Sequence, residues 1–265
     1  MYDFNYQRAD SVAYAVSKVK SADDGTLMAG GMTLIPTLKQ RLAQPSDVVD
    51  LGGIADLIGI SVDGDTVTIG AMTTHATVAH SADVKARIPA LADLAESIGD
   101  PQVRNRGTIG GSIANNDPAA DYPSACLGLG ATIVTDQREI AADDFFTGLF
   151  ETALNEGEVI TAVKFPVPAK AAYMKFPNPA SRYAIVGVFV AQTGGAARVA
   201  VTGAGQDGVF RVPEMESALG ANFSADAVAN ISVSPDDLNS DIHASSEYRA
   251  HLVTVMAKRA VAKAG

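Results

Sequence analysis

Ala29-Gly30-Gly31-Met32-Thr33 and Thr108-Ile109-Gly110-Gly111-Ser112 are the two most informative stretches of this chain of 265 residues. Each joins a pair of glycines to a following hydroxyl residue. A diphosphate needs backbone N–H groups that come close with no Cβ in the way, and glycine allows that approach. One such pair is more typical of a tight turn. Two pairs with matching hydroxyls favour a split phosphate-binding site.

The segments around the glycine pairs predict how each pair is held. Thr26–Ala29 is a predicted strand, and Thr33 is a suitable N-cap for a helix over Thr33–Leu42. The first pair should therefore lie between a strand and a helix. The second pair is expected in a loop, because a polar segment precedes it and the turn-rich segment Ile113–Asp121 follows it. A helix is predicted next, over Tyr122–Leu129.

Composition excludes several classes of protein. With 47% hydrophobic residues the chain should bury a large core, and its net charge of −10 argues against nucleic-acid binding. No G-x-G-x-x-G or P-loop motif is present. The N-terminus lacks the pattern of a signal peptide, and the longest apolar run, Ala184–Ala191, is too short to span a bilayer. We therefore expect a cytoplasmic protein with no transmembrane segment, although association with a membrane surface stays open.

Metal-ligating residues are scarce. Cys126 is the single cysteine, and its apolar surroundings favour a buried side chain. The four histidines are scattered without the spacing of metal ligands. We expect no metal and no iron–sulfur cluster in this chain.

The second half of the chain changes character near Val167–Ala171. Before it, Asp63-Gly64-Asp65 predicts a hairpin turn between two strands. After it, alternating apolar segments predict a small antiparallel sheet followed by helices. The predicted strands of that sheet are Tyr173–Phe176, Tyr183–Gln192 and Ala197–Thr202, and the predicted helices are Pro213–Leu219, Ala225–Asn230 and Glu247–Lys263.

Three longer segments carry a resemblance to a known family. Ala29–Pro36 (AGGMTLIP), Gly99–Gly111 (GDPQVRNRGTIGG) and Asp117–Pro123 (DPAADYP) resemble the FAD-binding medium subunit of the molybdenum hydroxylases. The resemblance is to the medium subunit of aerobic carbon monoxide dehydrogenase in particular, and it extends to the flavoprotein part of xanthine dehydrogenases. It continues through Glu158–Pro166 and Glu247–Leu252, and so covers nearly the whole chain.

The resemblance implies an α+β fold. Residues 1–168 would form an FAD-binding domain of the vanillyl-alcohol oxidase (PCMH) type. Its two subdomains would cover about 1–56 and 57–168. Residues 172–265 would form a small α+β C-terminal domain.

The resemblance also implies which positions contact the cofactor. The backbone of both glycine segments would hold the FAD diphosphate. Many relatives have a polar residue where this chain has Met32, so contacts from that side chain are in doubt. The implied positions are Ala29, Gly30, Gly31, Met32, Thr33, Ile98, Thr108, Ile109, Gly110, Gly111, Ser112, Asp121, Ile160, Lys175 and Tyr183.

Several of these positions have a second interpretation. Asp121 matches a residue that contacts a ribose or adenine group, and its alternative role is to cap the helix that begins at Tyr122. Lys175 would stabilise the negative charge of reduced flavin, or be a solvated strand lysine. Tyr183 would stack on the isoalloxazine ring, or lie in the core. Ile98 and Ile160 would flank the cofactor or pack internally.

The resemblance implies a flavin subunit that does not oxidise the substrate itself. FAD would bind noncovalently, since neither glycine segment holds a His or Cys. A large partner subunit would carry molybdopterin, and a small one would carry two [2Fe-2S] clusters. FAD would pass electrons to an external acceptor such as a quinone. The complex would be a dimer of heterotrimers, and would be cytoplasmic or peripheral to the inner membrane. The alternatives are a stand-alone FAD-dependent oxidoreductase and a binding module without redox activity.

Overall fold

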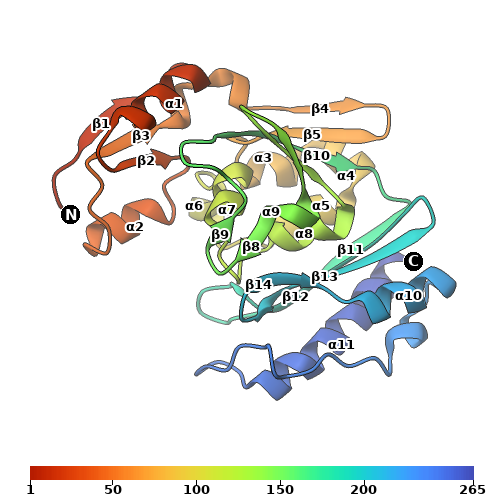
Figure 1. Ribbon diagram of the computed structural model, residues 1–265. Coiled ribbons are helices and arrows are strands. Elements are labelled where there is room, and N and C mark those ends of the chain that lie inside the picture. The colour runs from red at the N-terminus through yellow and green to blue at the C-terminus, as the bar shows by residue number, and fades with distance from the viewer.

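The computed structural model describes residues 1–265 and shows an α+β protein built from three sheet-centred units (Figure 1). The N-terminal unit lies to one side, and the C-terminal sheet lies below the central unit in this view. The two chain ends lie on opposite sides of the molecule. No helix combines the length and the apolar character needed to cross a bilayer.

The N-terminal unit is a three-stranded parallel sheet in the order β1-β3-β2. Ser11 caps α1 by accepting a hydrogen bond from the N–H of Tyr14. Strand β1 was not predicted. Its side chains are mostly exposed, so it lacks the alternating apolar pattern of a half-buried strand. The elements of this unit are β1 (Asn5–Arg8), α1 (Val12–Ser21), β2 (Gly25–Met28), α2 (Leu34–Lys39) and β3 (Asp47–Asp50).

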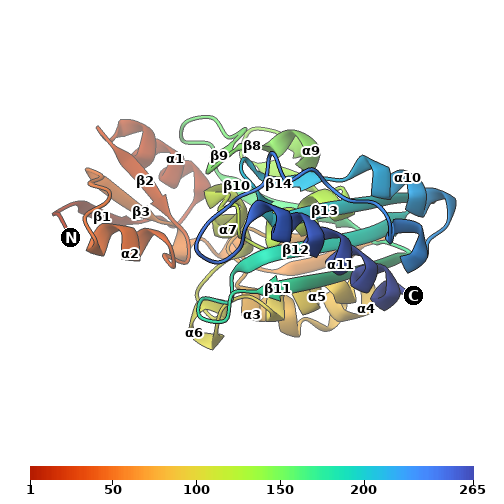
Figure 2. The same cartoon turned by 90° about the horizontal axis from the view of Figure 1, so that it is seen from below.

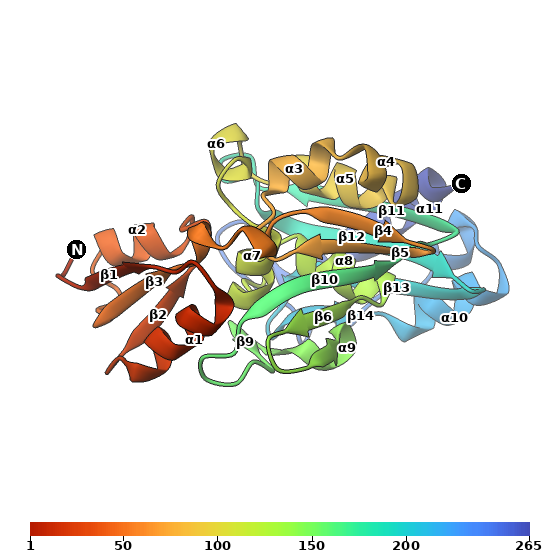
Figure 3. The same ribbon diagram turned by 90° about the horizontal axis from the view of Figure 1, so that it is seen from above.

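The central unit is built on a five-stranded antiparallel sheet, seen from above in Figure 3. The predicted hairpin at Asp63-Gly64-Asp65 is present, because Asp63 pairs with Thr66. A separate two-stranded hairpin lies beside the sheet. In spatial order the main strands are β4 (Ile60–Asp63), β5 (Thr66–Gly70), β10 (Ile160–Pro166), β6 (Thr132–Thr135) and β7 (Glu139–Ala141), and the hairpin is β8 (Phe146–Gly148) with β9 (Glu151–Thr152).

Short helices cover the central sheet. Residues of these helices and of the sheet form the largest buried apolar cluster of the protein, which includes Cys126 as expected. The helical stretch breaks at Pro89, where α5 begins after α4 has ended at Arg87. The helices are α3 (His75–His80), α4 (Ala82–Arg87), α5 (Pro89–Glu96), α6 (Pro101–Arg104), α7 (Ile109–Asn115), α8 (Tyr122–Leu129) and α9 (Ala142–Phe145).

The second glycine pair is not in a loop, which corrects the sequence-based expectation. Gly110 and Gly111 lie in the first turn of α7, and Thr108 is its N-cap, with Oγ1 accepting a hydrogen bond from the N–H of Gly111 at 3.1 Å. The helix runs on to Asn115. Glycine is a poor helix former, so the sequence Gly-Gly concealed this helix. A buried environment and a good N-cap outweigh that preference here.

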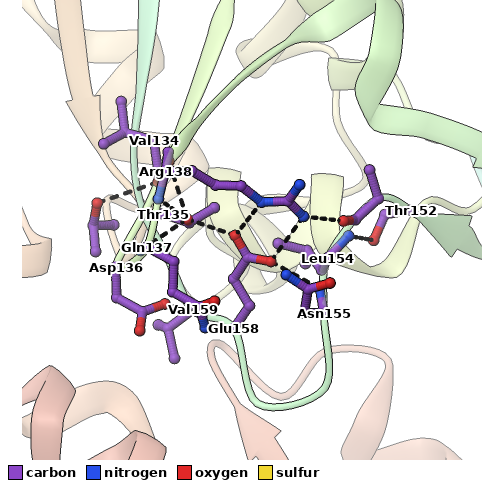
Figure 4. A network of polar contacts seen from close by, with 12 residues as sticks. Val134, Thr135, Asp136, Gln137, Arg138, Thr152, Leu154, Asn155, Glu158 and Val159 are labelled. Atoms are coloured by element: carbon purple, nitrogen blue, oxygen red, sulfur yellow. Dashed lines mark hydrogen bonds and ion pairs between the residues drawn. The ribbon is translucent and has the colours of Figure 1, made fainter.

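A buried carboxylate ties the turn between β6 and β7 to the segment that leads into β10 (Figure 4). Glu158 accepts hydrogen bonds from Arg138 Nε at 3.0 Å, from Thr135 Oγ1 at 2.7 Å and from the N–H of Asn155 at 2.8 Å. The bonds from Arg138 lower the pKa of Glu158 to about 2. This network fixes one end of the central sheet.

The C-terminal unit is a four-stranded antiparallel sheet between two layers of helices. Helix α11 packs on one face, while α8 and α5 of the central unit pack on the other, as Figures 1 and 2 show. The predicted helix over Ala225–Asn230 is a short 3₁₀ helix, η3, over Ala225–Val228. The other elements are β11 (Lys170–Pro177), β12 (Ala184–Thr193), β13 (Ala196–Gly205), β14 (Gly208–Arg211), α10 (Pro213–Ala221) and α11 (Ser246–Ala264).

Candidate functional site

A cavity of about 460 Å³ opens where the three units meet. This volume is in the range of ligand sites in proteins. Both glycine segments and the loop between β11 and β12 contribute to its wall. The lining residues are Ala29, Gly30, Gly31, Met32, Thr33, Leu34, His75, Ile98, Gly99, Asp100, Val103, Gly107, Thr108, Gly111, Ser112, Asn115, Asp117, Ala120, Asp121, Ala180, Ser181, Arg182 and Tyr183.

The first glycine segment presents a row of unused donors to this cavity. The backbone N–H groups of Ala29 through Leu34 donate no hydrogen bond within the protein. Thr33 is the N-cap of α2, but its side chain makes no capping bond, so its hydroxyl is also available. Consecutive free N–H groups before a helix form a concave site for an anion. This segment fits a diphosphate.

The first segment is held in place by direct contact with the residues that precede the second. A Cβ on Gly30 would lie 2.0 Å from the carbonyl oxygen of Arg106 and 2.9 Å from Cα of Gly107. A Cβ on Gly111 would lie 3.1 Å from Cβ of Ala29. Real Cβ atoms do not approach backbone so closely, so a side chain at Gly30 would push the two segments apart.

The second segment is different, because its N–H groups are already used. Ile109 donates to the carbonyl of Thr73, Gly110 to that of Ala71, and Ser112 to that of Thr108, while Gly111 donates to the Thr108 side chain. The expectation of a backbone cradle made by both segments therefore needs correction. The second segment offers the Ser112 hydroxyl and a wall without side chains, and only the first offers a row of free N–H groups.

A buried polar cluster lies at one side of the cavity. The Asp121 carboxylate accepts a hydrogen bond from the Tyr173 hydroxyl and lies 3.0 Å from Nζ of Lys175, which also donates to the carbonyl of Ser97 at 2.9 Å. The side chains of Asp121 and Lys175 are at most 7% exposed. Burial raises the pKa of Asp121, and the charge of Lys175 opposes that rise. Asp121 lines the cavity, and Lys175 supports it from behind.

Asp121 does not use its side chain to cap α8, which was the alternative interpretation. Instead its backbone carbonyl accepts a hydrogen bond from the Ser124 hydroxyl. The carboxylate is therefore left for the buried cluster and for the cavity. An ionised carboxylate can accept more than two hydrogen bonds, so it keeps capacity for a hydroxyl or amino donor.

His75 is a cavity residue that sequence reasoning missed. It is the first residue of α3, it is 5% exposed, and its ring lies 5.3 Å from the ring of Tyr122. Its Nδ1 has no hydrogen-bond partner. Burial and the charge of Arg104 lower the pKa of His75 to about 4, so the imidazole is neutral near pH 7. The only signal in the sequence is Thr74, which caps α3 and thereby fixes His75 at its start.

The loop between β11 and β12 closes the opposite side. Asn178 organises it, since its Oδ1 accepts hydrogen bonds from the N–H groups of Ala180 and Ser181. Arg182, at a φ of 63°, is the one basic side chain on the cavity wall. Tyr183 is 47% exposed, and its pKa is raised by burial and by the nearby charges of Asp117 and Asp121.

The structure brings most of the expected positions to one cavity, and leaves four outside its wall. Ile98, Asp121 and Tyr183 line the cavity with both glycine segments. Ile160 is 6% exposed within the largest apolar cluster, where it packs internally. The expected positions that do not line the cavity are Ile109, Gly110, Ile160 and Lys175.

Comparison with known proteins places this chain in a family. Residues 2–168 match the family model described as the FAD binding domain in molybdopterin dehydrogenase. The chain belongs to this family of FAD-binding proteins. Its cofactor is FAD, and it is an oxidoreductase subunit of the molybdenum hydroxylase type.

Relatives of this FAD-binding family match over almost the full length. The chain is 35% identical to the nicotine 6-hydroxylase medium subunit of Paenarthrobacter nicotinovorans, covering 98% of this chain and 96% of the relative. It is 35% identical to the carbon monoxide dehydrogenase medium chain of Hydrogenophaga pseudoflava, covering 97% and 96%. A solved structure of that carbon monoxide dehydrogenase superposes with a TM-score of 0.88 at 34% identity, covering 99% and 97%. These likenesses confirm the α+β FAD-binding fold that the sequence predicts.

Proposed function

We propose that this chain is the electron-transferring flavin subunit of a molybdenum-containing hydroxylase. A large partner subunit would oxidise the substrate at molybdopterin, and a small partner subunit would relay electrons through [2Fe-2S] clusters. FAD would then pass the electrons to an external acceptor such as a quinone. The observation that carries the proposal is the cavity between the three units, with a free row of N–H groups on one wall and Tyr183 on the other.

The proposed placement of FAD follows from the donors on the wall. Its diphosphate would lie on the N–H groups of Ala29–Thr33, with the hydroxyls of Thr33 and Ser112 beside it. Asp121 would accept from a ribose hydroxyl or the adenine amino group, and Tyr183 would cover the isoalloxazine ring. Lys175 would act through Asp121, because it contacts that carboxylate rather than the cavity.

The charges on the cavity wall are consistent with a backbone cradle. Asp100, Asp117 and Asp121 line the cavity, against Arg182 as the one basic side chain. Neutral N–H groups can hold a diphosphate without a cluster of cations. In this acidic chain such a cradle replaces the lysines and arginines that other phosphate sites use.

Attachment of FAD should be noncovalent. His75 is the only His or Cys on the cavity wall, and its Nδ1 is enclosed by protein atoms. Its ring packs 5.3 Å from the ring of Tyr122. An imidazole that is only 5% exposed gives the flavin little access to a nucleophile.

The side chains of this chain support the assignment of the iron–sulfur clusters to a partner subunit. Cys126, the only cysteine, is buried, and no cluster of His, Cys, Asp or Glu could hold a metal. A [2Fe-2S] cluster requires several cysteine or histidine ligands. The clusters and molybdopterin would therefore belong to partner subunits. We propose a dimer of heterotrimers in the cytoplasm, at most peripheral to the inner membrane.

We also propose the domain division at residues 168–172. Strand β10 ends at Pro166 and β11 begins at Lys170, so the short connection between the central and C-terminal sheets, residues 167–169, overlaps the start of this range. Residues 1–168 would bind most of the FAD. Residues 172–265 would contribute Tyr183 and close the flavin end of the cavity.

Co-purification tests this function. The chain carries an affinity tag in its native host, and the captured material is analysed for flavin, molybdenum and iron. The proposal expects FAD together with both metals and two further subunits. A chain that purifies alone with FAD and rapidly oxidises a small substrate would instead be a stand-alone oxidoreductase. Colourless protein without metals would be a module without redox function.

A further inference from the structure

The two ring nitrogens of His75 lie in different surroundings. Nδ1 is enclosed by protein atoms and has no hydrogen-bond partner. The Nε2 edge of the ring lies against Gly107, because a Cβ on Gly107 would be 2.5 Å from Nε2 and 2.9 Å from Cδ2. Both residues line the proposed FAD cavity. The missing side chain of Gly107 therefore leaves space next to Nε2 at the cavity wall.

Gly107 is required for this space rather than for its backbone conformation. Its φ lies outside the left-handed region, so other residues could adopt its backbone angles. Its carbonyl oxygen accepts a hydrogen bond from the N–H of His75 at 3.0 Å, and Thr74 pairs with Thr108 across the same junction. The backbone bond and the close approach of the ring together fix His75 beside the second glycine segment.

The position of the His75 proton follows from these surroundings. Burial and the charge of Arg104 lower the pKa of the imidazole to about 4, so the ring carries one proton near pH 7. On Nδ1 that proton would be an enclosed donor without an acceptor, which is unfavourable. On Nε2 it can reach a ligand, because the side-chain hydrogen bonds at the start of α3 come from Thr74 and Thr77 and leave the imidazole free. The neutral ring therefore holds its proton on Nε2 and offers a donor to the cavity.

This donor lies close to the free N–H row of the first glycine segment. A Cβ on Gly30 would lie 2.9 Å from Cα of Gly107, the same residue that adjoins Nε2 of His75. The N–H groups of Ala29 through Leu34 donate no hydrogen bond within the protein. An anion held by that row would therefore have the Nε2–H beside it.

The same side of the cavity offers few other donors. The N–H groups of Ile109–Ser112 are already used. Arg104 is held in an ion pair and does not line the cavity. The hydroxyls of Thr108 and Ser112 and the Nε2–H of His75 remain. Side chains, rather than the backbone, therefore supply the donors on this side.

We propose that His75 is a phosphate-binding residue of the FAD site, and that its Nε2–H donates a hydrogen bond to an oxygen of the cofactor's diphosphate. The inference rests on the function proposed above. A neutral imidazole in this place adds a donor without adding a charge. Its lone pair, which is the nucleophilic part of the ring, stays on the enclosed Nδ1 and away from the cofactor.

The affinity for FAD tests the contact on the chain freed of its cofactor. His75→Leu removes the donor and should raise the Kd about tenfold, the value of one hydrogen bond to a charged group. His75→Gln can place an amide N–H near the Nε2 position and should recover most of the affinity. The matched control is His80→Leu at the other end of α3, where the side chain is 68% exposed. That variant should bind FAD as the wild type does.

Nuclear magnetic resonance locates the contact on the cofactor. In the wild type labelled with ¹⁵N-histidine, Nε2 of His75 should resonate as a protonated nitrogen at pH 7, and Nδ1 as an unprotonated one. At saturating FAD, His75→Leu should shift a ³¹P resonance of the bound cofactor, because a donor to the diphosphate has been lost. The visible flavin spectrum of this variant should match that of the wild type, since the isoalloxazine ring keeps its surroundings.

Three results would overturn the assignment. The first is equal affinity for FAD in the wild type and in His75→Leu. The second is a wild-type imidazole that carries its proton on Nδ1 while FAD is bound. The third is a His75→Leu variant that binds FAD more weakly with unchanged ³¹P resonances, which would make the role of His75 structural. In all three cases the chain still holds FAD and the proposed function stands, whereas a wild-type chain that takes up no FAD would mean that the proposed function itself fails.

Discussion

The carbonyl oxygen of Arg106 lies 2.0 Å from the position that a Cβ on Gly30 would take. The first glycine segment and the residues just before the second, far apart in sequence, are thus packed backbone against backbone. Gly30 is needed for this contact as well as for access to a ligand. Proteins hold phosphates by arranging N–H groups in space, and here that arrangement depends on one residue having no side chain.

Gly30→Ala should therefore weaken FAD binding by more than tenfold and destabilise the fold by about 1–3 kcal/mol, the usual cost of overpacking. The measurements are FAD retention during gel filtration and urea unfolding. The matched control is Gly220→Ala in α10, where an added Cβ meets no atom within 4 Å. That variant should keep its FAD. Normal FAD affinity in Gly30→Ala would contradict the proposed role of the contact.

The hydroxyl of Thr33 should matter more than its methyl group. It makes no capping bond in the protein, so we expect it to donate to a phosphate oxygen. Thr33→Val keeps the shape and removes the donor, and should raise the Kd for FAD about tenfold, the value of one hydrogen bond to a charged group. Thr33→Ser should stay close to the wild type. Fluorescence titration of the protein freed of FAD measures the Kd of each variant. A Kd for Thr33→Val equal to that of the wild type would exclude a phosphate contact.

Lys175→Met should leave Asp121 buried beside Tyr173 without its cation. Breaking a buried ion pair from one side costs about 3–5 kcal/mol. The pKa of Asp121, already raised by burial, should rise further once Lys175 no longer opposes that effect. The double variant Asp121→Asn with Lys175→Met should recover much of the loss in urea unfolding. If the loss of stability in the double variant equals the sum of the losses in Asp121→Asn and Lys175→Met, the two residues are not coupled.

His75 should make the protein less stable as the pH falls. The unfolded chain takes up a proton on this imidazole near pH 6.5, whereas the folded protein does so only near pH 4. Protons therefore favour the unfolded state between these values, and the free energy of unfolding should fall by about 3 kcal/mol. Urea unfolding at pH 7, 5.5 and 4 measures this slope. In the His75→Leu variant the dependence of the unfolding free energy on pH should be flatter. A slope equal to that of the wild type would mean that other groups cause the pH dependence.

The sequence predicted the elements whose apolar pattern is strong and local. The helix over Tyr122–Leu129 and the long strands of the C-terminal sheet follow from such patterns. Helix α7 was missed because Gly110 and Gly111 are poor helix formers, and burial together with the Thr108 cap decides its conformation. Strand β1 was missed because it is held mainly by backbone pairing with β3.

Most of the candidate site was named in advance, but not the way its parts interact. The N–H groups of Ala29–Leu34 are free and those of Ile109–Ser112 are not. Ile109 and Gly110 donate to the distant residues Thr73 and Ala71, while the other two donate to Thr108. The pairing of Asp121 with Lys175 joins residues from different units. His75 enters the cavity only because α3 begins beside Gly107. Such relationships depend on the folded chain and leave no pattern in the sequence.

The central claim is that this chain holds FAD noncovalently in the cavity between its three units. The most direct measurement is the visible absorbance of the purified chain before and after unfolding in guanidinium, followed by ultrafiltration. The account predicts about one FAD per chain in the folded protein, with all of the flavin passing through the filter after unfolding. Flavin retained with the unfolded chain, or a folded chain without flavin absorbance that takes up no added FAD, would contradict it.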